Sequence, residues 1–270
     1  MKSRLLVAAV GVPLVLVILV FLPPVATAVF VALLTAVAAH ELCGATGKPP
    51  HAFTALTMLC AVWIQVCLYF GAPVSTLAIG ALLYFLLLFV LWVAYHERDV
   101  AFGFIQFGAG LMGGLVVPLC LGSLTLLRLS DNGVFCVLVP FVIAFIGDAG
   151  ALFSGMLFGK HKLAPKTSPK KTVEGAAGGL VCSALFMVVY GLVLRAFDVR
   201  ASLLLMALWG VCGGVVSQLG DLAFSLIKRE FGIKDYGRIL PGHGGVLDRF
   251  DSMVTLAPAI VLFFSLARPF

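Results

Sequence analysis

The chain has 270 residues, of which 62% are hydrophobic and 11% are charged, with a formal net charge of +6. A soluble domain carries roughly 25% charged residues and under about 50% apolar ones, so this composition excludes a water-soluble fold. We predict an all-α integral membrane protein with one membrane domain overall. In such a protein the basic balance reflects loops near lipid headgroups, and we expect no nucleic-acid partner.

The apolar runs predict nine transmembrane helices, since a span needs about 20 apolar residues. Lys2 and Arg4 precede the first run, and Ala26-Thr27-Ala28 resembles a signal-peptidase site. The apolar run resumes at Val25, so we expect the first segment to be retained as a span. The predicted spans are residues 5–22, 25–39, 52–70, 75–95, 101–127, 134–158, 176–194, 201–227 and 252–267.

The positions of the basic residues orient these spans. With a cytoplasmic N-terminus, most of the 18 Lys and Arg residues fall in cytoplasmic segments. Positive residues favour that side of a membrane. We therefore expect the N-terminus and the two large basic loops to face the cytoplasm.

Glycine is unevenly distributed along the chain. Most of the 29 glycines follow residue 100, and pairs spaced four apart occur at 110/114, 175/179 and 210/214. Such spacing lets transmembrane backbones approach closely, within one chain or between two copies. We therefore divide the chain into N-terminal helices, 1–100, and a tightly packed catalytic region, 101–270. The seven cysteines form no CxxC pair and are interpreted as small buried hydrophobes.

Two carboxylates lie inside predicted spans, where ionisable groups are costly and are functional candidates. Asp148 lies in one apolar run, and Asp221 lies seven residues before Lys228, which is about 10 Å along a helix. Ser217, Asp221 and Ser225 are spaced four apart. They form a polar stripe that predicts a cavity or a polar neighbour rather than lipid.

The loop after this span carries further acidic and basic residues. Asp248 and Asp251 are three apart, so both point to one face if the last helix has begun there. With Asp221 they could hold a hard divalent cation through oxygen. Glycines at 242, 244 and 245 would let the backbone approach a phosphate.

The segment from Lys160 to Thr172 interleaves lysines with hydroxyls. It is an ordinary positive-inside loop or a phosphate-binding one, and Glu174-Gly175 directly after it favours phosphate binding. Carboxylates, basic residues and glycines together are what phosphoryl-type transfer needs. His243 could bind metal, donate a proton, contact phosphate or only shape its loop. No Walker A motif is present.

Two segments resemble blocks of a known family, the phosphatidate cytidylyltransferases. The first is Ser225-x-x-Lys228-Arg229-x4-Lys234-Asp235-x-Gly237-x3-Pro241-x-His243-Gly244-Gly245-x2-Asp248-Arg249-x-Asp251, and the second is Ser168-Pro169-Lys170-Lys171-Thr172-x-Glu174-Gly175. Together they cover about a fifth of the chain. Around Asp148 the sequence departs from the family, because Ala149 and Leu152 stand where members often have Thr and an aromatic residue.

The resemblance implies a membrane nucleotidyltransferase of phospholipid biosynthesis that condenses CTP with phosphatidic acid to CDP-diacylglycerol and pyrophosphate. It implies Mg²⁺ in a two-metal site, which could also take a monovalent cation. The expected partners are CTP, phosphatidate, the bilayer and, through the glycine faces, a second copy. In a bacterium the location would be the inner membrane, with the active site at the cytoplasmic side of the C-terminal helices.

The residues and the resemblance together predict three groups of site residues. The catalytic group is Asp221, Asp248, Lys228, Arg229 and His243. The substrate-binding group is Ser168, Lys170, Lys171, Thr172, Lys234, Asp235, Gly244, Gly245 and Arg249. The metal ligands are Asp148, Asp221, Asp248 and Asp251.

Two other classes fit parts of the pattern. Another membrane lipid-phosphate transferase would share the phosphate chemistry, although the DGxxAR-type motif of CDP-alcohol phosphotransferases is absent. An ion-coupled transporter would also use intramembrane aspartates, but near the midplane and with access from both sides. Release of pyrophosphate with phosphatidate as acceptor separates these classes.

Overall fold

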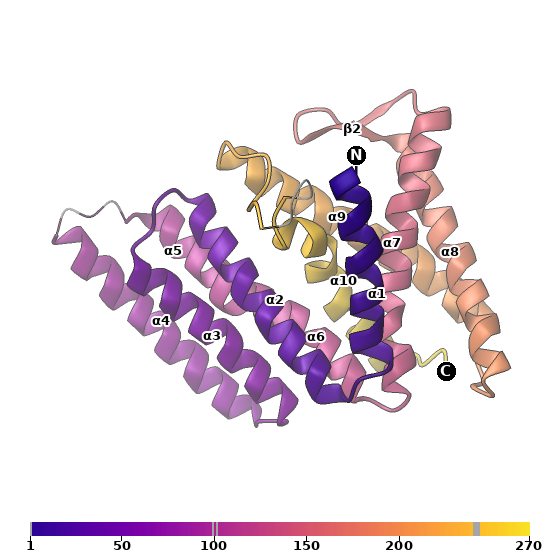
Figure 1. Ribbon diagram of the computed structural model, residues 1–270, viewed down its shortest axis with the longest axis horizontal. Helices are drawn as coiled ribbons and strands as arrows, with labels where there is room; N and C mark the ends of the chain where they lie inside the picture. The colour runs from indigo at the N-terminus through magenta and orange to yellow at the C-terminus, as the bar shows by residue number, and fades with distance from the viewer. Residues whose placement is uncertain (1, 99, 101, 240–243) are drawn as a thin grey trace. The chain divides into compact units, whose positions relative to one another are not determined.

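The computed structural model describes residues 2–98, 100, 102–239 and 244–270, with side chains from residue 10 onward. Helices dominate these residues (Figure 1). The long ones are α1 (Lys2–Val20), α2 (Pro24–Ala45), α3 (His51–Tyr69), α4 (Val74–His96), α7 (Gly133–Phe158), α8 (Val173–Ala196), α9 (Leu203–Glu230) and α10 (Leu247–Leu266). Between α4 and α7, α5 (Phe104–Leu111), the π-helical turn η1 (Met112–Val116) and α6 (Val117–Leu129) follow one another directly.

Eight helical stretches among the described residues are long and apolar enough to cross a membrane, and Val10–Val20 is a shorter apolar helix. They follow the order of the nine predicted spans. The prediction of an all-α, multi-pass membrane protein is therefore confirmed. Pro23, Pro50 and Pro73 directly precede α2, α3 and α4. Proline is favoured at a helix start because its missing N–H would have no intrahelical partner there.

The second span differs from its prediction in length. The expected span ended at residue 39, before His40 and Glu41, whereas α2 continues to Ala45 and has 22 residues. Glu41 does not end the helix, because its side chain is 4% exposed and its carboxylate accepts backbone hydrogen bonds. A buried charge with such partners is tolerated in an otherwise apolar helix.

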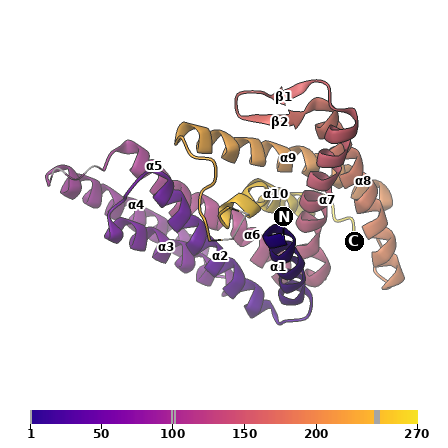
Figure 2. The same cartoon turned by 45° about the horizontal axis from the view of Figure 1, so that its top comes forward.

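The basic segment before α8 is a β-hairpin rather than an irregular loop. Strand β1 (Lys162–Ala164) pairs antiparallel with β2 (Ser168–Thr172). Figure 2 shows the two strands between the ends of α7 and α8. The hairpin was not predicted, since its two strands are short and rich in lysine, which strands disfavour.

The chain divides into two compact units. Unit 1 comprises Met1–Ser130 and Phe231–Phe250, and unit 2 comprises Asp131–Glu230 and Asp251–Phe270. The boundary between them therefore falls within α10. The limits of the two units reflect how the residues pack. The predicted division at residue 100 rests on glycine content and stays a prediction of where the chemistry lies.

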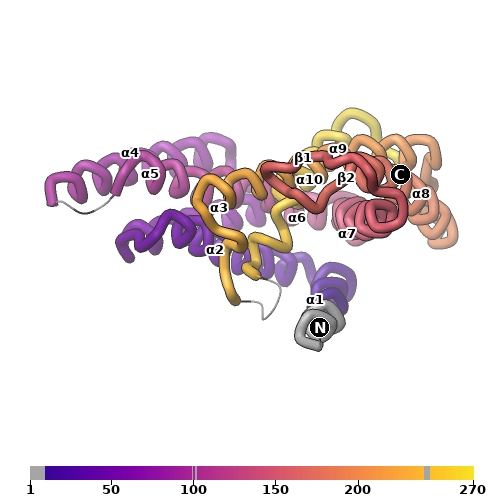
Figure 3. Tube along the Cα trace, turned by 90° about the horizontal axis from the view of Figure 1, so that it is seen from above, coloured from indigo at the N-terminus to yellow at the C-terminus, as the bar shows by residue number. Residues whose placement is uncertain are grey.

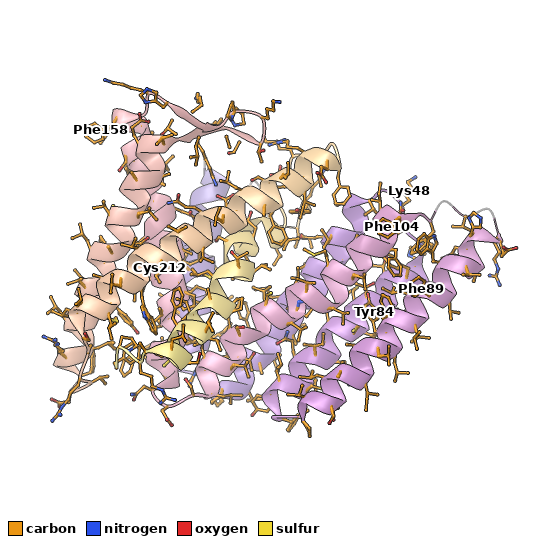
Figure 4. All side chains as sticks on the ribbon, turned by 180° about the vertical axis from the view of Figure 1, so that it is seen from behind. Lys48, Tyr84, Phe89, Phe104, Phe158 and Cys212 are labelled. Atoms are coloured by element: carbon orange, nitrogen blue, oxygen red, sulfur yellow. The ribbon has the colours of Figure 1, made fainter. Side chains whose placement is uncertain are left out.

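In unit 1, α2 packs against α3 and α6, and α3 also packs against α6. The Tyr84 hydroxyl lies 2.8 Å from the carbonyl oxygen of Gly110 and 3.2 Å from Thr57 Oγ1. Figure 4 labels Tyr84 and Phe89 of α4 and Phe104 of α5. A Cβ on Gly110 would meet the Phe53 ring at 2.6 Å, so this glycine makes room for an aromatic side chain.

In unit 2, the glycines bring helix backbones together. A Cβ on Gly175 would meet the carbonyl oxygen of Ala151 in α7 at 2.8 Å, and one on Gly179 would meet that of Gly147 at 2.8 Å. Gly210 lies equally close to the backbone of α8. The prediction that the glycine pairs 175/179 and 210/214 allow close helix packing within the chain is therefore confirmed.

Replacement of Gly210 by Ala is expected to destabilise unit 2. The new Cβ would lie 2.6 Å from the Ser183 carbonyl oxygen and from Ala184 Cα, which are backbone atoms that cannot rotate away. Overpacking of this kind costs about 1–3 kcal/mol. The control is Gly108→Ala in α5, where a Cβ meets nothing within 4 Å. Thermal unfolding in detergent should show a lower midpoint for Gly210→Ala alone, and an unchanged midpoint would contradict the packing described here.

Candidate active site

A cavity of about 400 Å³ lies in unit 2. The β-hairpin, α7, α8 and α9 contribute its walls, and Figure 3 shows the hairpin beside α9. Its polar lining consists of Asp148, Lys170, Lys171, Thr172, Gln218 and Asp221. Five of these six residues were predicted from the sequence as site residues, and Gln218 was not. The cavity therefore combines carboxylates with amino groups, as phosphate chemistry requires.

Two of the predicted site residues meet in this cavity through an ion pair. Lys171 Nζ of β2 pairs with Asp221 Oδ2 of α9, and their side chains are 29% and 25% exposed. Ser225 Oγ donates to the other carboxylate oxygen, Oδ1, at 3.3 Å. The predicted polar stripe on α9 is therefore confirmed, because Ser217 and Ser225 are buried and Asp221 turns to the cavity.

A second ion pair lies deeper in unit 2. Lys228 Nζ of α9 is 3.8 Å from Asp251 Oδ2 of α10, and both side chains are 11% exposed. The Asp251 carboxylate is also within electrostatic range of Asp221 and Asp148. We call Asp148, Lys171, Asp221, Lys228 and Asp251 the carboxylate–lysine cluster. Buried charges need partners, and the buried Lys228 and Asp251 supply them for each other.

The hairpin is held in place at both ends. Thr172 Oγ1 accepts from Gly175 N at 3.1 Å and so caps the first turn of α8. Glu174 accepts from the backbone N–H groups of Lys160 and His161. At the hairpin turn, the Thr167 carbonyl oxygen accepts from Arg229 Nε at 3.2 Å. Arg229 was predicted to be catalytic, and in this structure its Nε orients the hairpin that carries the lysines.

The remaining predicted residues of this region differ in exposure. Lys170 is exposed, whereas Ser168 is half-buried in β2. Asp148 lines the cavity from α7, although the residues around it depart from the family pattern. All three therefore belong to unit 2, and Asp148 and Lys170 line its cavity.

Most of the first block lies in unit 1, where we call residues 231–250 the signature loop. Asp248 Oδ2 accepts from Tyr236 N at 2.8 Å and from Gly245 N at 2.9 Å, which closes the loop. Gly244 has φ +82°, and a Cβ there would meet Asp248 Oδ2 at 3.0 Å. Glycine is needed at this position both for its backbone conformation and for space.

The other predicted residues of the signature loop differ in exposure. Lys234, Asp235 and Arg249 are exposed, and Gly245 is buried. His243 lies outside the described residues, so its predicted catalytic role stays a prediction. Glu41 of α2, which the sequence did not single out, accepts from the backbone at the start of α10.

The donor set fits a hard divalent cation, since carboxylate oxygens are the ligands that Mg²⁺ prefers. Among the described residues, no three His, Cys, Asp or Glu side chains form a metal-binding group. Asp221 and Asp251 are each paired with a lysine instead. A cation held by these oxygens would therefore compete with Lys171 and Lys228 for them.

The helices and the charged cavity define an integral membrane protein equipped for phosphate chemistry. Residues 2–267 match the cytidylyltransferase family, and the chain belongs to this family. It is 44% identical over 141 residues to a phosphatidate cytidylyltransferase of Staphylococcus saprophyticus, which covers 52% of this chain and 53% of that protein. It is 41% identical over 140 residues to the phosphatidate cytidylyltransferase of Staphylococcus aureus. That alignment covers 52% of this chain and 53% of that protein. The chain spans about half the length of the curated relatives it matches.

Proposed function

We propose that the protein condenses CTP with phosphatidate, giving CDP-diacylglycerol and pyrophosphate. The observation that carries this proposal is the unit 2 cavity, where lysines of the hairpin meet carboxylates of α7 and α9. The relatives support this choice of substrates, because they are phosphatidate cytidylyltransferases. The cavity supplies the charges that such substrates need.

The reaction needs positioning and charge neutralisation more than a strong base. A phosphate oxygen of phosphatidate attacks the α-phosphorus of CTP, and the bond from that phosphorus to the bridging oxygen of the β-phosphate breaks. The attacking phosphate is already anionic near neutral pH, so no residue has to remove a proton from it. Lys170 and Lys171 would hold phosphate oxygens and stabilise the charge on the departing pyrophosphate.

Asp148, Asp221 and Asp251 of unit 2 are the residues that would hold Mg²⁺, and Asp248 of unit 1 stays a predicted ligand. When bound, Mg²⁺ would neutralise phosphate charge during the transfer. Lys171 and Lys228 would then be released from their carboxylates and become available to phosphates. The number of metal ions stays as predicted from the resemblance, a two-metal site.

The cavity wall also suits a lipid substrate. Leu152 and Met156 of α7 line the cavity and are 60% and 72% exposed. Apolar side chains beside a charged cavity would let acyl chains stay in the bilayer while the headgroup enters. We propose a cytoplasm-facing site in a bacterial inner membrane, in a chain that can form a homodimer.

Pyrophosphate release by purified protein in detergent tests the proposal. CTP, phosphatidate and Mg²⁺ are each omitted in turn, and formation of CDP-diacylglycerol is followed in parallel. We expect release only with all three present, in a one-to-one ratio with the lipid product. Release with a different lipid phosphate but not with phosphatidate would assign the cavity to another membrane transferase, and no release from a folded sample would contradict the proposal.

A further inference from the structure

Glu41 is a buried carboxylate in an otherwise apolar helix, and its partners lie about 200 residues away along the chain. Its side chain is 4% exposed. Oε1 accepts from Val246 N at 2.9 Å, and Oε2 accepts from Leu247 N at 2.8 Å. Both donors are backbone groups at the start of α10, which begins at Leu247. Each carboxylate oxygen therefore holds one N–H at the end of the signature loop.

The loop backbone closes tightly around this carboxylate. A Cβ on Gly245 would lie 2.6 Å from both oxygens of Glu41, and a Cβ on Gly237 would also collide with the carboxylate. Two glycines from different parts of the signature loop therefore pack on one side chain. A side chain at either glycine would push the loop away from α2.

A carboxylate is well suited to this place. The first N–H groups of a helix have no intrahelical acceptor, and the helix dipole favours negative charge there. Hydrogen bonds to an ionised acceptor are roughly twice as strong as neutral ones. A glutamine of the same shape would turn an NH₂ group toward one of the two N–H donors and lose that bond.

Asp248 adds two further hydrogen bonds between the start of α10 and the signature loop. It lies one residue after Leu247, and its Oδ2 accepts from Tyr236 N and Gly245 N. Glu41 thus holds the start of α10, and Asp248 holds Tyr236 and Gly245 of the loop to it. A shift of the Glu41 carboxylate would move Asp248 and the exposed Arg249 together.

We propose that Glu41 is a positioning residue of the transferase, whose buried carboxylate anchors the signature loop and so places Asp248 and Arg249 for the reaction. This inference rests on the proposed function. It makes α2, which belongs to the N-terminal helices without any predicted chemistry, part of the catalytic machinery. Glu41 acts through the loop and does not touch the substrates.

Hydrogen exchange measures the anchoring without any need for activity. In Glu41→Gln, amides of residues 235–239 and 244–248 should exchange about tenfold faster or more, because a charge-assisted hydrogen bond is lost. Exchange elsewhere in the chain should stay as in the unmodified protein. The control is Glu97→Gln, which removes the same charge from an exposed position at the end of α4. Glu41→Asp keeps the charge on a side chain one methylene shorter and should give an intermediate rate.

Steady-state kinetics then measure the positioning. Small misplacements of catalytic groups can cost about 100-fold in rate, so we expect Glu41→Gln to lower kcat at least about tenfold. The KM values for CTP and phosphatidate should change less than about threefold, because the lost interaction acts on the transition state. Glu41→Asp should recover part of kcat, whereas a purely structural role would lower the unfolding temperature and leave kcat of the folded protein unchanged.

The two measurements separate the possible failures. Loop exchange that matches the unmodified protein, or that rises equally along the whole chain, would overturn the anchoring. Faster loop exchange with unchanged kcat would overturn the positioning role. If the unmodified protein releases no pyrophosphate, the proposed function fails, and exchange still decides whether Glu41 holds the loop. If Glu41→Gln does not fold, the same two readouts on Glu41→Asp decide.

Discussion

Asp248→Asn is expected to lower turnover about 100- to 1000-fold while leaving the signature loop folded, since losing one charge-stabilising group at a reacting phosphate has effects of this size. The geometry makes this substitution informative. Two backbone donors, Tyr236 N and Gly245 N, are bonded to the same oxygen, Oδ2. The single carbonyl oxygen of asparagine can take its place, so the variant removes charge and keeps these two bonds.

Asp248→Ala is the matched comparison, because it removes the charge and both loop bonds. Pyrophosphate release measures turnover, and hydrogen exchange of residues 235–239 measures loop order. We expect both variants to be nearly inactive, but only Asp248→Ala to exchange rapidly in the loop. Substantial activity in Asp248→Asn would mean that the carboxylate only closes the loop, and its prediction as a metal ligand would be wrong.

The sequence predicted the helices well, because lipid imposes a simple rule on composition and length. Prolines and short polar segments separate the apolar runs, so the helices of the structure follow the order of the predicted spans. The stripe of Ser217, Asp221 and Ser225 was also readable, since its spacing of four matches one face of a helix. Glycine spacing indicated close packing in unit 2, where Gly179 and Gly210 contact neighbouring backbones.

The parts that the sequence did not reveal depend on contacts between distant residues. Glu41 stands two residues beyond the predicted span 25–39, and its partners are Val246 and Leu247. Nothing local in the sequence marks such a pair. The two backbone hydrogen bonds that Asp248 accepts were not predicted either. Its carboxylate was assigned to metal binding, and nothing in the sequence shows that the same carboxylate also closes the loop.

The hairpin shows a different limit. The segment from Lys160 to Thr172 was interpreted from its lysines, its interleaved hydroxyls and the following Glu174-Gly175, and the pairing of its two strands was not predicted. Pairing the strands turns Lys171 toward Asp221 and leaves Lys170 exposed. The alternation along a strand thus separates two lysines that look equivalent in the sequence.

Asp221→Asn is expected to lower turnover about 100- to 1000-fold, because this carboxylate lies at the centre of the proposed phosphate chemistry. The ion pair with Lys171 offers a second explanation for such a loss, since breaking it could disturb the hairpin. Exchanging the two residues distinguishes these explanations. The double variant Lys171→Asp with Asp221→Lys restores an ion pair but exchanges the positions of the carboxylate and the amino group.

If Asp221 acts chemically, the double variant should recover the thermal stability of unit 2 and remain at least about 100-fold less active than the unmodified protein. If the pair is only structural, activity should return along with stability, and the assignment of Asp221 to the reaction would fail. The matched control exchanges Arg268 and Asp131, an ion pair of 3.6 Å in the same unit whose side chains are 70% and 91% exposed. Surface pairs of this kind contribute little, so this exchange should change neither the unfolding midpoint nor pyrophosphate release. Recovery of stability without recovery of turnover would therefore place the requirement on the positions of the carboxylate and the amino group in the cavity rather than on the presence of an ion pair.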